Sequence, residues 1–117
     1  MREIEVALLK ANPGGFRNAY GNFNAIHLGP YSMSIQGSTG HYCTPRSDFH
    51  VCGYISMELL LYKKGRKYDI WKCKDVKSFP RVEELLERNT ERNYPIGWVD
   101  MELLNDLYLH LKTLTRS

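Results

Sequence analysis

The 117-residue sequence lacks any hydrophobic run of the roughly 20 residues that a membrane-spanning helix needs. Its first residues, Met1–Glu5, include two acids where a secretory leader carries basic and then apolar residues. We therefore expect no leader, no membrane partner and a cytoplasmic location.

Cysteine is scarce, with three residues at positions 43, 52 and 73. An odd number, in a chain large enough to fold without disulfides, favours free thiols in a reducing compartment. His41-x-Cys43 and His50-x-Cys52 repeat one spacing and together offer four possible zinc ligands. That spacing differs from common zinc fingers, so we predict no metal.

Recognised catalytic signatures are also missing. Cysteine, histidine and aspartate occur close together between residues 41 and 52, but without a known nucleophile–base pattern. The glycines between residues 12 and 22 match neither a Walker A loop nor a dinucleotide fingerprint. We predict that the protein is not an enzyme and has no cofactor.

What is present is an ordinary globular composition, 43% hydrophobic and 25% charged, and one domain over residues 1–117. The net charge of +3 is unevenly distributed. Residues 1–79 carry eleven Lys and Arg against six Asp and Glu, net +5, whereas residues 80–117 carry five against seven, net −2. This division favours an anionic ligand held by the first part, although exposed lysines in the turn at residues 63–67 equally serve solubility.

Alternation of apolar and polar residues predicts strands in the first part of the chain. The expected strands are Ile4–Leu9, Phe23–Leu28, Tyr31–Ile35, a central Gly53–Tyr62 and Tyr68–Lys72. The turn residues Gly29-Pro30 predict that the strands Phe23–Leu28 and Tyr31–Ile35 form a hairpin. We therefore expect a β-sheet region over residues 1–77.

The periodicity becomes helical after Pro80. One helix is expected from Ser78 or Phe79 to Asn89, and a second from an N-cap at Asp100 nearly to the C-terminus. The predicted fold is α+β, an antiparallel sheet of about five strands followed by two C-terminal helices over residues 78–117. The last helix is apolar over a wide face, which either packs entirely on the sheet or forms a homo-oligomer.

Two long loops contain the residue types that hold phosphate and bases. Residues 38–50 combine His41, Tyr42 and Arg46, and residues 12–22 combine Phe16, Arg17, Asn18 and Tyr20. The alternative is that both are exposed connections without a ligand. Acids along both helices argue against double-stranded nucleic acid, whereas tyrosines on the strands suit either single-stranded bases or sheet packing.

The sequence resembles the phage Thoeris anti-defence sponges, the first type described. The similarity rests on I-E-V-A-L-L, on Y-S-M-S-I-Q-G leading into H-Y-C-T-P-R, on Y-I-S-M-E-L-L-L-Y and on Y-P-I-G-W-V-D. The resemblance implies an oligomer in the host cytoplasm during infection that sequesters cyclic ADP-ribose isomers made by host TIR-domain proteins. Some members of the family also bind cyclic oligonucleotides, and none needs catalysis.

A cyclic ADP-ribose isomer carries two phosphates and an adenine, which call for arginine forks and stacking rings. Arg17, Tyr42, Arg46 and Trp71 supply these groups, and Arg92 and Asn93 between the helices are candidates for a second wall. The alternative function is a phage inhibitor that binds a host defence protein directly, in the manner of an anti-CRISPR.

Overall fold

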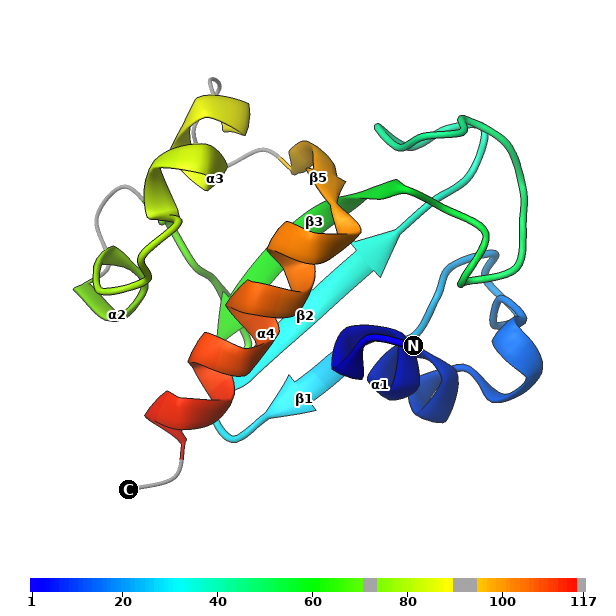
Figure 1. The fold of residues 1–117 in the computed structure, drawn as a ribbon. Helices are drawn as coiled ribbons and strands as arrows, with labels where there is room; N and C mark the ends of the chain where they lie inside the picture. Colours follow the sequence, from blue (N-terminus) through cyan, green and yellow to red (C-terminus); the bar gives the residue numbers. More distant parts are fainter. Residues whose placement is uncertain (71–73, 90–94, 116–117) are drawn as a thin grey trace.

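The computed structural model describes residues 1–70, 74–89 and 95–115 (Figure 1). It contains a five-stranded antiparallel sheet together with helices, which confirms the predicted α+β class. The elements in chain order are α1 Glu3–Ala11, the 3-10 turn Pro13–Gly15, β1 Ile26–Leu28, β2 Tyr31–Gln36, β3 Ser56–Lys63, β4 Arg66–Lys67, α2 Lys74–Lys77, α3 Val82–Arg88, β5 Ile96–Asp100 and α4 Met101–Leu114.

The strand β3 is the centre of the sheet, as predicted. It pairs with β2 along one edge, with Ile35 opposite Leu59, and β2 pairs with β1 through the hairpin expected at Gly29-Pro30. On its other edge β3 pairs with β4 near its end and with β5 near its start. All these pairings are antiparallel.

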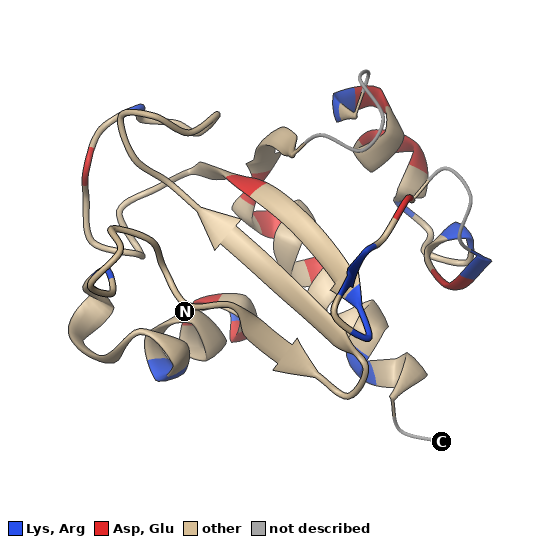
Figure 2. Ribbon diagram, turned by 180° about the vertical axis from the view of Figure 1, so that it is seen from behind, with Lys and Arg blue, Asp and Glu red and all other residues tan. Residues whose placement is uncertain are grey.

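One face of the sheet contributes to the hydrophobic core. Alternate residues of β2 and β3, among them Met33, Ile35 and Leu59, are fully buried, as are four leucines of α4. Figure 1 shows α4 lying across this face, and in Figure 2, turned by 180°, the opposite face has no helix in front of it. The sheet therefore has one covered and one open face.

The predicted strand Ile4–Leu9 is wrong, because these residues belong to the helix α1. Ile4 and Leu8 lie one turn apart and are both buried, whereas Val6 is exposed. The Ile4 N–H donates to Asn105 Oδ1 of α4 at 2.9 Å, and the Arg2 N–H donates to the Glu5 carboxylate at 3.2 Å. Contacts with a helix about 100 residues away thus decide the conformation of this segment.

The division into a sheet region before residue 78 and a helical region after it is also wrong in two places. The first region contains α1 and α2, and the second contains β5. Strand β4 has only two residues, so Tyr68–Ile70 lies outside it, and the rest of that predicted strand falls outside the described residues. The two C-terminal helices occur as α3 and α4, the second directly after Asp100.

Among the described residues, no helix has the length and apolar character that a membrane crossing requires.

Candidate functional site

The open face of the sheet has a hollow of about 490 Å³. Residues of β2, β3 and the two long loops form it: Asn18, Asn22, Phe23, Asn24, Ala25, Ser34, Gln36, His41, Glu58, Leu60 and Tyr62. We call this the sheet-face hollow. Most of its side chains can donate or accept a hydrogen bond, so it suits a polar ligand.

The loop that contains Asn18, Asn22 and Asn24 is held against β2 by side-chain hydrogen bonds. The Phe23 N–H donates to Gln36 Oε1 and Gln36 Nε2 donates to the Phe23 carbonyl, both at 2.8 Å. Asn18 Oδ1 accepts the N–H groups of Tyr20 and Asn22, and its Nδ2 donates to Asn24 Oδ1 at 2.9 Å. This side of the hollow is therefore preformed.

Glu58 places a carboxylate at the end of the hollow. Its side chain lies on the open face and is buried, and Oε2 accepts the N–H of Tyr42 at 3.0 Å. This hydrogen bond ties the loop that follows β2 down over the central strand.

Tyr42, Arg46 and Trp98 form an exposed group beside Glu58, which we call the aromatic cluster. The ring centroids of Tyr42 and Trp98 are 4.9 Å apart, and the Arg46 guanidinium lies 5.6 Å from the Tyr42 ring centroid. The two rings are 45% and 51% exposed. An exposed pair of rings with an arginine provides stacking surface and positive charge at one place.

The backbone of Trp98 is in the left-handed region, with φ of 50°. Two residues of β5, Gly97 and Trp98, lie opposite Glu58 alone on β3, which makes a bulge. The Trp98 N–H donates to the Tyr42 carbonyl at 2.9 Å, and Arg88 Nε donates to the Trp98 carbonyl at 3.1 Å. The bulge is thus held from both sides.

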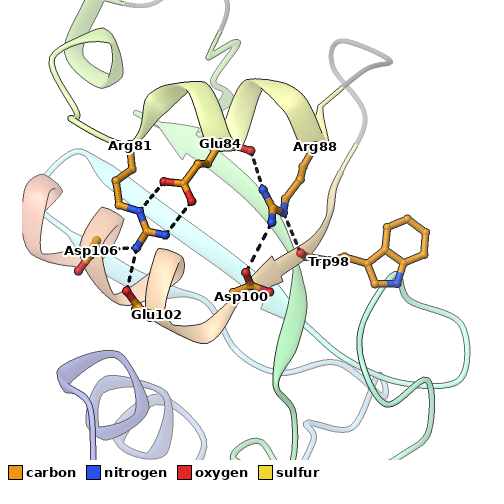
Figure 3. A network of polar contacts seen from close by, with 7 residues as sticks. All are labelled: Arg81, Glu84, Arg88, Trp98, Asp100, Glu102 and Asp106. Carbon is orange, nitrogen blue, oxygen red and sulfur yellow. Dashed lines mark hydrogen bonds and ion pairs between the residues drawn. The ribbon is translucent and has the colours of Figure 1, made fainter.

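Figure 3 shows the polar network behind the bulge, with the indole of Trp98 directed away from it. Arg88 also donates to the Glu84 carbonyl at 3.0 Å and pairs with Asp100. Arg81 binds the carboxylates of Glu84, Asp106 and Glu102. The hydrogen bonds that Arg81 donates to Glu84 and Asp106 raise the pKa of Arg81, and the bond to Glu84 lowers the pKa of that carboxyl.

Several predicted site residues do come together. His41 and Asn18 line the sheet-face hollow, and Tyr42 and Arg46 belong to the aromatic cluster. His41 Nδ1 is hydrogen-bonded to the Ser38 hydroxyl at 2.6 Å, which orients the ring. Phe16 and Tyr20 are 76% and 90% exposed and do not line the hollow.

Arg17 has a different environment from the one expected of a ligand-binding arginine. Its guanidinium donates to the carbonyls of Gly37 and Phe49 and to the Tyr54 hydroxyl, and it lies 4.5 Å from the centroid of the Phe23 ring. These contacts join three loop segments, so three of its five N–H donors are already used within the protein.

Three predicted site residues, Trp71, Arg92 and Asn93, lie outside the described residues. Sequence reasoning did not select Glu58 or Trp98, both of which the fold brings to the site. Glu58 looked like the polar side of an alternating strand, and Gly97-Trp98 looked like a helix entry. The sequence Gly97-Trp98-Val99 could have indicated a bulged strand here, because glycine within a strand often marks a bulge.

The four possible zinc ligands are distributed over different environments. The Cys43 thiol is buried against the carbonyls of Ser38 and Pro45, and His50 Nδ1 accepts the Cys52 N–H at 3.1 Å. Burial, followed by the charge of Glu5, raises the pKa of Cys52. Within the described part of the chain, no group of three or more His, Cys, Asp or Glu side chains is arranged to hold a metal ion.

Comparisons of the chain with protein-family models, with curated proteins and with solved structures find no match.

Proposed function

We propose that the protein binds a small cyclic nucleotide in the sheet-face hollow and sequesters it unchanged. By its resemblance to the Thoeris anti-defence sponges, the ligand is a cyclic ADP-ribose isomer, and the role is to remove an immune signal during phage infection. The observation that carries the proposal is a preformed polar hollow whose lining residue Glu58 accepts the N–H of Tyr42, the residue whose ring lies against Arg46.

The size and chemistry of the hollow support this proposal. About 490 Å³ is within the range of small-molecule sites, and its amide, hydroxyl and imidazole groups match the hydroxyls of ribose and the edge of a base. Glu58 is the natural acceptor for a ribose diol, since carboxylates fill this role in dinucleotide sites.

The phosphates of the ligand require a cation at one edge. Arg46 is exposed and has no carboxylate partner among the ion pairs of the described residues. It can therefore turn its fork toward phosphate while Tyr42 stays against Glu58. We therefore expect the phosphates of the ligand to lie against Arg46, outside the buried Glu58 carboxylate.

A second candidate function is the direct binding of a host defence protein. Exposed Trp, Tyr and Arg are the residues that dominate binding energy in protein interfaces, and the aromatic cluster contains one of each. In this case the cluster binds a partner side chain and the hollow stays filled with water.

Thermal unfolding with a panel of nucleotides separates the two. A ligand present at 100 times its dissociation constant stabilises the folded state by about 2.7 kcal/mol. We expect this shift with a cyclic ADP-ribose isomer, and we expect mass spectrometry to recover the ligand intact after heat denaturation. No shift with any nucleotide favours the protein partner, and recovery of a linear or hydrolysed product shows an enzyme.

The variant Arg46→Ala tests the site. We expect it to lose at least tenfold in nucleotide affinity while its melting temperature stays near that of the wild type, because the side chain is exposed. Lys112→Ala is a matched control, since Lys112 also lies over a tyrosine ring, that of Tyr108, at 5.5 Å but on α4. Equal binding by both variants would exclude Arg46 from the site.

A further inference from the structure

We infer that Trp98 is a base-stacking subsite beside the sheet-face hollow and that Arg88 is the residue that positions it. The chemical class of the ligand group is a planar heteroaromatic ring, such as a purine. The inference rests on the proposed function in one respect, namely that this ring belongs to the sequestered nucleotide.

The backbone of Trp98 is the first reason. A bulky residue with φ of 50° is strained, and such strain persists where the surrounding structure enforces it. A residue that serves only the fold gains little from this conformation, because glycine or asparagine would adopt it with less strain. The strain therefore indicates a role for the indole itself.

The exposure of the indole is the second reason. Trp98 is 51% exposed, so the hydrophobic effect alone does not explain a tryptophan there. One contact of the ring is with Tyr42 at 4.9 Å, and Figure 3 shows the indole pointing away from the Arg88 network. Stacking of a base on an aromatic side chain contributes to binding, and it needs an exposed ring.

The bulge is built to hold this arrangement. At Gly97, an added Cβ would lie 2.9 Å from Cβ of Tyr42, so only glycine allows the two segments to approach this closely. The Trp98 N–H and carbonyl are both satisfied, by Tyr42 and by Arg88. Bulges commonly redirect a side chain next to a functional site.

Arg88 is a positioning residue because its contacts are with the bulge and not with the hollow. Its guanidinium joins the Trp98 carbonyl, the Glu84 carbonyl and the Asp100 carboxylate, which lie on β5 and α3. Without it, the left-handed residue would lose the hydrogen bond to its carbonyl. We expect the Trp98–Tyr42 pair to separate in that case.

Fluorescence titration tests the subsite. The chain has two tryptophans, so in a Trp71→Phe background, whose affinity for adenosine 5′-monophosphate is first compared with that of the wild type, the emission comes from Trp98 alone. We expect adenosine 5′-monophosphate to quench this emission and ribose 5-phosphate, which has no base, to leave it unchanged. We expect Trp98→Ala to weaken adenosine 5′-monophosphate binding at least tenfold, measured by calorimetry, and Trp98→Phe to restore most of it.

Stability measurements test the strain without any ligand. In an unstrained position alanine is more stable than glycine, whereas in the left-handed region the order reverses. We expect Trp98→Gly to melt above Trp98→Ala. The opposite order would remove the argument from strain.

The positioning role is tested with Arg88→Ala, Arg88→Lys and Arg81→Ala. We expect Arg88→Ala to shift the Trp98 emission and to weaken adenosine 5′-monophosphate binding several-fold, with partial rescue in Arg88→Lys. Arg81 belongs to the same network but does not touch Trp98, so Arg81→Ala should leave the emission unchanged. Equal effects of the Arg81 and Arg88 variants would overturn the positioning role.

The outcomes for the two proposals are distinguishable. A cyclic ADP-ribose isomer that binds wild type and Trp98→Ala equally well overturns the subsite and leaves the proposed function intact. Quenching by adenosine 5′-monophosphate, with no binding of any cyclic nucleotide, supports the subsite and overturns the proposed sequestration. Absence of quenching and of binding overturns both.

Discussion

Arg17 and Arg46 are the same residue type in similar glycine- and aromatic-containing loops, but the fold gives them opposite roles. Arg17 donates to two carbonyls and one hydroxyl within the protein, whereas Arg46 is exposed above the Tyr42 ring. From the sequence alone both were candidates for phosphate binding. Only the positions of the acceptors distinguish a structural arginine from an available one.

The first prediction concerns Arg17. Arg17→Ala leaves the Gly37 and Phe49 carbonyls without this donor and removes one of the two donors to the Tyr54 hydroxyl, so we expect a loss of about 2–3 kcal/mol of unfolding free energy. Arg46→Ala is the matched control, with an expected change within about 0.5 kcal/mol. Chemical denaturation measures both, and equal stabilities would contradict the structural role of Arg17.

A second prediction at this scale concerns pH. Hydrogen bonds from Lys63, at 2.5 Å, and from Tyr31 lower the pKa of the Asp75 carboxyl. A depressed folded-state pKa stabilises the protein above the unfolded value of about 3.9, and that stability is lost as the pH falls through the folded-state value.

We therefore expect Asp75→Asn to have a smaller difference in melting temperature between pH 7 and pH 2.5 than the wild type. Tyr31→Phe removes one of the two hydrogen bonds and should give an intermediate difference. An unchanged difference in Asp75→Asn would show that Asp75 does not contribute to acid sensitivity.

Among the elements, the hairpin, the central strand and the last amphipathic helix could be predicted from the sequence, whereas the first helix could not. The β1–β2 hairpin, the central strand β3 and the helix α4 follow from local patterns that their own residues satisfy. The I-E-V-A-L-L segment alternates like a strand, yet its Ile4 and Leu8 also lie on one helical face. Packing against α4 selects the helix, and a local pattern cannot show that packing.

The element-scale prediction concerns the contact between α3 and α4. Arg81, next to the start of α3, binds Glu84 on α3 and both Asp106 and Glu102 on α4. We expect Arg81→Ala to lose about 1 kcal/mol at low salt and less at high salt, because the carboxylates are partly exposed and screened.

Lys77→Ala is the control, because Lys77 is exposed at the end of α2 and has no ion pair among those of the described residues. Denaturation curves of both variants at two salt concentrations measure whether the loss of unfolding free energy depends on salt. A loss in Arg81→Ala that does not depend on salt would point to packing of the side chain instead of its charge.

In the whole molecule, the basic residues of the β3–β4 hairpin lie next to the Tyr62 end of the hollow and not at its Glu58 end. Figure 2 shows Lys and Arg gathered at the β3–β4 hairpin and on α2, whereas β3 carries an acid at its other end. The positive charge of the first 79 residues is therefore unevenly placed around the hollow, with lysines near its Tyr62 end and a carboxylate at its Glu58 end. Arg46 is the cation on the side of Glu58, and the hairpin lysines make the electrostatic potential more positive for an approaching anion.

Self-association through the C-terminal helices stays a prediction. The sheet side of α4 is buried within the chain, and its Leu109 lines a groove of about 320 Å³ with Phe79 and His110. We expect light scattering to give a mass at least twice 13.6 kDa for the wild type and a lower mass for Leu109→Lys. A wild-type mass of 13.6 kDa would contradict this prediction.

The sequence by itself determined the α+β class, the central strand and the final helix, because these follow from the periodicity of apolar residues along one segment. It also identified His41, Tyr42 and Arg46 as candidate site residues from their chemistry. The tertiary structure alone decided that α1 is helical, that Arg17 is used internally and that Glu58 and Trp98 lie at the site. Each of these depends on a contact with a residue distant in the sequence: Asn105 for α1, Phe49 for Arg17, and Tyr42 for Glu58 and Trp98. Local sequence patterns cannot show such contacts, because only folding brings these residues together.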